Sequence, residues 1–181
     1  MRIPSRFMPK APNREISKYG FALLIIFLAV LFGFVFWQAP FWGISLSTAS
    51  ILLVVFSYFR VRSAKRSFLK FAQNRPGDSI CTFTRSFDTH AVDTWIIRAV
   101  YEELQAELRQ FHPTLPIRAD DRLLDDLHID DEDLDLDVVP VIAKRTGRTL
   151  ANLQSNPYFG KVNTVADLVH FFNAQPSSDA A

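Results

Sequence analysis

Two long stretches without a charged residue constrain this chain more than any other feature. The first runs from Tyr19 to Trp37 and the second from Phe41 to Phe59, with only Gln38-Ala39-Pro40 between them. An α-helix needs about 20 apolar residues to cross the hydrocarbon core of a bilayer. Because almost nothing separates the two stretches, they predict a transmembrane helical hairpin whose two ends lie on the same side of the membrane.

Basic residues flank this predicted hairpin at both ends. Residues 1–18 hold five of them, and the segment after the second span holds six more: Arg60, Arg62, Lys65, Arg66, Lys70 and Arg75. Positively charged loops stay on the cytoplasmic side, so we expect both termini in the cytoplasm. A cleaved signal peptide is the alternative, but the first stretch lacks an A-x-A-like cleavage site and a second span follows it at once.

Charge is divided unequally along the chain. Residues 1–75 hold eleven Lys or Arg against the single Glu15, whereas residues 76–181 hold nine against eighteen Asp or Glu. This asymmetry predicts contact with membrane lipids at one end and a basic protein partner at the other. Neither span contains Asp, Glu, Lys, Arg or His, the residues that mark ion paths, so we expect an anchor rather than a transporter. Small residues spaced four apart in the spans also allow a homo-oligomer through the hairpin.

The rest of the chain is predicted to form four segments. Residues 1–18 are expected to be a loose basic cytoplasmic arm against the lipid head groups. Residues 60–91 are expected to form a basic juxtamembrane helix to Arg75, followed by an extended linker with room for one short strand. Residues 92–174 read as a compact helical domain, and 175–181 as a disordered tail. The expected fold class is therefore all-α.

Helix start and stop residues delimit the elements of this domain. Asp93 is a good N-cap for a first helix that ends near Gln110. Asp130 caps a second helix, which Gly147 ends, and Pro140 is expected to kink or shorten it.

Two shorter elements complete the domain. A short third helix is expected over 149–155. The closing helix begins at Thr164, where Asp167 stands three residues on, as in a capping box.

This order of helices resembles that of acyl carrier proteins, and three short motifs strengthen the resemblance. Residues 120–130 (Asp-Asp-Arg-Leu-Leu-Asp-Asp-Leu-His-Ile-Asp) are similar to the segment that leads to the attachment serine of carriers. Residues 164–169 (Thr-Val-Ala-Asp-Leu-Val) are similar to the start of their last helix. Together with Asn156-Pro-Tyr-Phe-Gly160, the pattern resembles an uncharacterised bacterial family of carrier-like domains. The resemblance implies a small helical bundle and, with the hairpin, a bacterial inner-membrane protein.

The chain departs from carriers where their chemistry resides. Asp131 stands in the place of the serine that takes the phosphopantetheine arm, and no serine occurs from Phe87 through Gln154. Without that hydroxyl no arm is attached and no thioester is carried. We therefore expect no cofactor and no enzymatic activity.

Acidic residues gather around the start of the second helix of the domain. We name them the acidic surface: Asp125, Asp126, Asp130, Asp131, Glu132, Asp133, Asp135 and Asp137. The resemblance to carriers implies that partners grip this surface. The hypothesis is that it docks a basic patch on a cytoplasmic protein, or alternatively the chain's own segment from Arg60 to Arg75. The simplest alternative is a set of solvated charges that favour the start of a helix. The second functional hypothesis is an accessory of lipid or fatty-acyl metabolism that binds pathway enzymes without carrying acyl groups.

Other chemistries fit the sequence less well. Alternate aspartates from Asp131 resemble a calcium loop, but Leu136 and Ile142 occupy the positions that need Gly and Glu. Cys81, Asp88 and His90 offer a nucleophile and a base for an enzyme without any supporting spacing. No residues have the spacing of metal ligands, and the basic residues flank lipid spans, so we expect neither a metal nor nucleic acid.

Overall fold

The structure is a computed structural model that describes residues 4–9, 18–38 and 40–178. Among these residues there is no β-strand, and only two isolated bridges, Arg122–Thr164 and Arg148–Ser177, join extended segments. The all-α prediction is therefore confirmed. The chain forms two compact units, one of residues 12–66 and one of residues 1–11 with 67–181.

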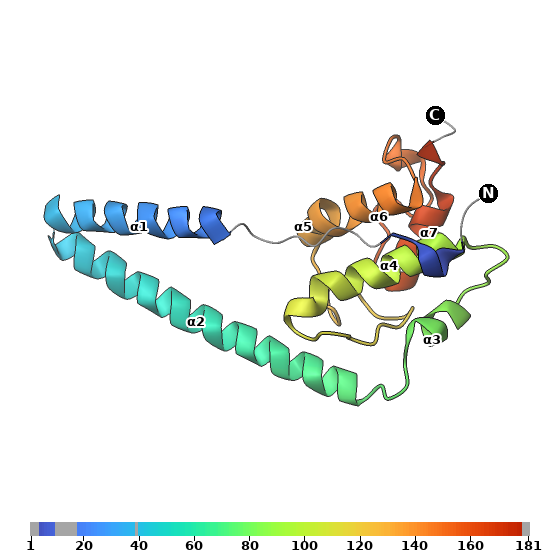
Figure 1. Cartoon of the computed structure of the whole chain (residues 1–181), viewed down its shortest axis with the longest axis horizontal. Helices are drawn as coiled ribbons and strands as arrows, with labels where there is room; N and C mark the ends of the chain where they lie inside the picture. The colour runs from blue at the N-terminus through green and yellow to red at the C-terminus, as the bar shows by residue number, and fades with distance from the viewer. Residues whose placement is uncertain (1–3, 10–17, 39, 179–181) are drawn as a thin grey trace. The chain divides into compact units, whose positions relative to one another are not determined.

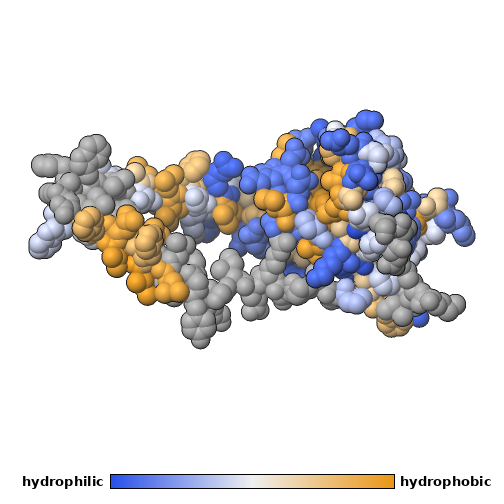
Figure 2. Space-filling view, turned by 90° about the horizontal axis from the view of Figure 1, so that it is seen from above, coloured by the Kyte–Doolittle hydropathy of each residue, from blue (hydrophilic) through white to orange (hydrophobic). Residues whose placement is uncertain are grey.

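The first unit contains two helices that follow each other closely (Figure 1). Helix α1 spans Lys18–Gln38, and α2 begins at Pro40 and runs to Gln73, so its last turns belong to the second unit. Proline is favoured at the first position of a helix, where its missing N–H costs no hydrogen bond. Consecutive apolar side chains of α1 are exposed from Ile25 to Leu28, as are those of α2 from Ile51 to Phe56. Figure 2 shows hydrophobic residues along these helices.

Since four or more successive residues point in all directions around a helix, the described parts of α1 and α2 expose apolar side chains on every side. In the part of the chain that the structure describes, no helix combines the length and the apolar character needed to cross a membrane.

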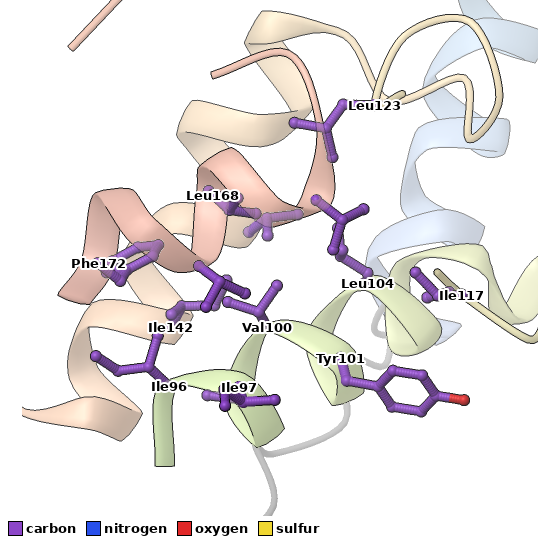
Figure 3. Packing of buried hydrophobic residues seen from close by; sticks show 14 of the residues in the cluster. Ile96, Ile97, Val100, Tyr101, Leu104, Ile117, Leu123, Ile142, Leu168 and Phe172 are labelled. Carbon is purple, nitrogen blue, oxygen red and sulfur yellow. The ribbon is translucent and has the colours of Figure 1, made fainter. Parts of the chain in front are cut away.

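The second unit is built around helix α4, Thr94–Glu107, which continues as the 3-10 turn η2, Leu108–Gln110. Asp93 caps α4 by accepting a 2.9 Å hydrogen bond from the N–H of Trp95, as predicted. Apolar residues at three- and four-residue steps bury one face, and α6 and α7 pack against it (Figure 3). The labelled core residues come from these helices and the loop between them: Ile96, Ile97, Val100, Leu104, Ile142, Leu168 and Phe172 among others.

The predicted second helix is present but consists of three consecutive pieces. It comprises α5 (Asp131–Asp133), a π-helical turn η3 (Leu134–Val138) and α6 (Val139–Thr146). Asp130 caps it by accepting a 2.9 Å hydrogen bond from the N–H of Asp133. Pro140 lacks the N–H that a regular α-helix would use, and the π-turn just before it takes up the mismatch. Gly147 ends α6 in the left-handed conformation at φ 65°, as predicted.

The closing helix α7 spans Val165–Ala174 and begins with the predicted capping box. The Thr164 hydroxyl accepts from the N–H of Asp167 at 3.1 Å, and the Asp167 carboxylate accepts from the N–H of Thr164 at 2.9 Å. The helix expected over 149–155 is reduced to the 3-10 turn η4, Leu153–Ser155. Asn152, just before η4, has the left-handed φ of 55°, which interrupts any longer helix.

The extended linker predicted after Arg75 is wrong for residues 80–85, which are helical. Residues Ile80–Arg85 form helix α3, which begins with reciprocal bonds between Ser79 and Thr82. Phe83 is 1% exposed and its ring lies 5.1 Å from that of Tyr101 on α4. The segment is helical because one large ring is buried against α4 while a Ser/Thr pair satisfies the first N–H groups.

Residues 4–9 also differ from the loose arm predicted for residues 1–18, while residues 1–3 and 10–17 of that arm lie outside the described residues. Residues Ser5–Phe7 form a 3-10 turn, η1, that packs on α4, and Met8 is 7% exposed within the core. Arg145 on α6 donates to the sulfur of Met8 at 3.2 Å. A polarisable thioether fills this gap beside a guanidinium, so the apolar Met8 rather than the basic residues sets the position of the segment.

Candidate interaction surface

The acidic surface lies on the last part of the loop before α5 and on α5 and η3. Six of its eight side chains are exposed, and those of Asp126 and Asp137 are half-buried. Two of its carboxylates bind locally to Arg122: Asp125 ion-pairs with the guanidinium at 2.6 Å and Asp126 accepts from the backbone N–H at 2.8 Å. The charges that remain in solvent are mainly those of α5 and of the first residues of η3.

Two large apolar side chains stand exposed among these acids. Leu136 on η3 is 65% exposed, and Leu124 in the loop before α5 is 62% exposed. Leu136 lies between Asp135 and Asp137 in sequence, and its neighbours Leu134 and Val138 are buried. An exposed leucine bordered by carboxylates offers a protein partner an apolar contact as well as charge.

The alternate aspartates do not form a calcium loop, because they lie on a continuous helical stretch. Residues two apart on a helix point to nearly opposite sides, so each aspartate of this series points away from the next one. Among the described residues, no group of three or more His, Cys, Asp or Glu side chains is placed to hold a metal ion.

Asp131, which the resemblance to carriers aligns with their attachment serine, is the first residue of α5, and its side chain is exposed. The position is therefore accessible, as an attachment site must be. A carboxylate at this position cannot form the phosphodiester that a serine hydroxyl forms, and instead adds negative charge at a helix N-terminus, where the helix dipole favours it.

The basic residues after the second stretch have different environments. Arg60, Arg62, Lys65, Arg66 and Lys70 are exposed on α2, and Arg62 donates to the Tyr58 hydroxyl at 3.1 Å. Arg75 instead forms a two-pronged ion pair with Asp121, with N–O distances of 2.6 and 2.7 Å. The side chain of Asp121 is only 2% exposed. Arg75 thus makes an intramolecular contact, with Asp121 rather than with the acidic surface.

A second buried ion cluster was not predicted from the sequence. Arg145 pairs with both Glu102 and Glu103 of α4, and its side chain is 7% exposed. Lys144 and Arg145 lie in the last turn of α6, where the helix dipole favours positive charge. The nearest available signal was Glu103, an acidic residue on the otherwise apolar face of α4, because a buried carboxylate needs a cation.

The residues considered for an enzyme site, Cys81, Asp88 and His90, lie near one another in sequence, and the Asp88 side chain bonds to the local backbone. Cys81 is exposed on α3. Asp88 accepts a 3.0 Å hydrogen bond from the backbone N–H of His90, which belongs to a turn.

A shallow depression of about 440 Å³ lies between the end of α2 and the loop after α4, with Arg75, Asp78, His112 and Thr114 among its lining residues. Arg75 is already paired with Asp121 there.

Comparison with family models, curated proteins and solved structures finds no match to this chain.

Proposed function

We propose that the chain is a membrane-anchored, non-catalytic interaction module that presents the acidic surface at the cytoplasmic face of a bacterial inner membrane. The observation that carries the docking part is Leu136, 65% exposed among the carboxylates of α5 and η3. Isolated solvated acids need no exposed leucine beside them, whereas a docking surface combines a central apolar contact with peripheral charge. The partner would present basic residues around an apolar contact.

The anchor part of the proposal rests on the sequence and on the helices formed by it. The uncharged stretches 19–37 and 41–59 fall within α1 and α2, and their described side chains expose apolar groups on every side. A helix that is apolar all round is typical of a membrane span or of a buried core helix. The proposal is based on all residues of both stretches, whereas the absence of a membrane-spanning helix was found for the described residues alone.

The carrier-like part is also a proposal. Its support is the order of elements, in which α4, a long loop, the acid-rich helix α5–α6, the turn η4 and α7 follow as in carriers. That order favours the second candidate function, an accessory of lipid or fatty-acyl metabolism that binds pathway enzymes without an acyl arm. A phosphopantetheine mass on the purified chain would overturn the non-carrier part of both.

Affinity capture from detergent extracts at low and high salt tests the docking surface. The full chain is compared with the triple variant Asp131→Asn, Asp133→Asn, Asp135→Asn. We expect captured partners to be lost in the variant, and to be released from the unchanged chain when salt shortens the reach of charge, to a Debye length of about 3 Å at 1 M.

A matched control removes three acidic charges elsewhere in the second unit: Asp88→Asn, Glu107→Gln and Asp120→Asn. This control is expected to keep every partner. Equal capture by the triple variant and the unchanged chain would show that the acidic surface does not dock a protein.

A further inference from the structure

The last turns of α2 place one face against the loop that leads to the acidic surface. Phe68, Phe71 and Arg75 stand at steps of three and four residues, so they lie on one side of the helix and of the turn that continues it. We name these three residues the terminal face of α2. Phe68 is 1% exposed, and Arg75 lies 3.7 Å above the ring of Phe71.

The terminal face contacts the loop of residues 116–129 at both of its ends. At the first end, Arg75 pairs with Asp121, which also accepts a 2.7 Å hydrogen bond from the N–H of Arg118. At the second end, the rings of Phe68 and His128 form a T-shaped pair with centroids 5.5 Å apart, and the ring of Phe68 stacks on that of Phe111 at 5.2 Å.

His128 lies two residues before Asp130, the N-cap of the acidic helix. It has a left-handed φ of 55°, a conformation that costs free energy for a residue with a side chain. Its neighbours Leu127 and Ile129 are 0% and 3% exposed, and the N–H of Ile129 donates to the carbonyl of Leu123 at 2.8 Å. Asp130, the N-cap of α5, follows directly. A packed ring on His128 therefore helps to hold the strained turn from which the acidic helix begins.

We propose that the terminal face of α2 holds the acidic surface in its docking conformation, so that this surface is ordered only while the face packs on the loop of residues 116–129. The proposal rests on the proposed function in that it regulates the same docking surface. Because α2 is one helix from Pro40 to Gln73, a change in its earlier residues has a covalent route to this face. The acidic surface would thus be coupled to the state of the hairpin.

Hydrogen exchange of the full chain without any partner tests this coupling. We compare Phe68→Ala with Leu69→Ala, the next residue on the same helix, whose side chain is 48% exposed. In Phe68→Ala we expect the peptide covering 128–134 to exchange about two- to tenfold faster, the range for a lost aromatic contact. The peptide covering 165–174 of α7 should not change, and Leu69→Ala should match the unchanged chain. Equal exchange of 128–134 in the two variants would overturn the proposal.

A second variant keeps the test decisive if Phe68→Ala loosens the whole unit. His128→Asn removes the ring that meets Phe68 but leaves the buried side chains of the core in place, because His128 itself is exposed, and asparagine tolerates a positive φ. Faster exchange confined to 128–134 in this variant supports the proposal, and unchanged exchange there overturns it. Because no partner is present, failure here is separate from failure of the capture experiment, which tests whether the acidic surface docks at all.

Discussion

The reciprocal bonds between Thr164 and Asp167 make the stability of α7 depend on pH. Burial of the Asp167 carboxyl raises its pKa, but hydrogen bonds from the Thr164 hydroxyl and the N–H groups of Thr164 and Asn163, with the nearby His170, bring the pKa below its ordinary value. The ionised carboxylate therefore stabilises the folded chain above about pH 4, the unfolded value, and this contribution is lost as pH falls through the lowered folded pKa.

Asp167→Asn should lower the free energy of unfolding at pH 7 by about 1 kcal/mol, the usual cost of a lost cap. The difference from the unchanged chain should begin to shrink below about pH 4, where the unfolded carboxyl takes up a proton, and should be lost as pH falls through the lowered pKa of the folded Asp167. Urea unfolding followed by the fluorescence of Trp95, with Trp37 and Trp42 replaced by Phe, measures both. Asp120→Asn, at an exposed position, should change stability by less than about 0.5 kcal/mol. A difference that persisted unchanged at pH 3 would contradict this account.

Residues that act on their own neighbours in sequence were predictable, and those that act across the fold were not. The caps Asp93, Asp130 and Thr164 were identified from spacing alone, because a cap bonds to N–H groups two or three residues on. Arg75 and Asp121 are 46 residues apart, and no local pattern pairs them. From sequence, Arg75 was only one of six basic residues near the membrane.

At the scale of elements, α3 depends on a single large side chain. Phe83 is 1% exposed and contacts the rings of both Phe87 and Tyr101, at 5.2 and 5.1 Å. Phe83→Ala should cost about 3 to 5 kcal/mol of unfolding free energy, the range for truncating a buried phenylalanine. Cys81→Ser on the same short helix is the control, and should change stability by less than about 0.5 kcal/mol because Cys81 is exposed. Similar stability of the two variants in urea unfolding would show that α3 is not part of the core.

Elements with repeated apolar spacing were predicted correctly, and short or interrupted ones were not. Helix α4 repeats buried apolar side chains at steps of three and four residues. Helix α3 has six residues and one buried side chain, which are too few to show a period. Pro140 predicted that the second helix would be disturbed, but it did not predict which form the disturbance would take. Whether a proline produces a kink, a break or the π-turn seen in η3 depends on which neighbours must stay buried, here Leu134 and Val138.

At the scale of the whole molecule, the N-terminal segment and the end of α2 belong to the same unit. Residues 12–66 are thus inserted between two segments that both contribute to one core, through Met8 and Phe68. Composition predicted a basic arm and a basic juxtamembrane helix at these places. It did not reveal the packing, because one methionine or phenylalanine among basic residues gives no periodic signal.

The position of the insertion leads to a topology prediction that the native chain can test. Cys81 is the single cysteine of the sequence and is exposed, so a membrane-impermeant maleimide reports on which side the second unit lies. In intact spheroplasts we expect no labelling of Cys81, and full labelling once the membrane is opened, because basic segments flank the two uncharged stretches and positively charged loops keep to the cytoplasm.

The matched control moves the cysteine to the connection between the two stretches. In a Cys81→Ser background, Ala39→Cys should be labelled in intact spheroplasts, since a hairpin that crosses and returns exposes its turn on the far side. Labelling of Cys81 in intact spheroplasts would reverse the orientation. Release of the chain by alkaline carbonate would show that it is not anchored in the membrane, and the acidic surface would then bind its partner away from any bilayer. The two results separate the side on which the second unit lies from whether the hairpin holds it there.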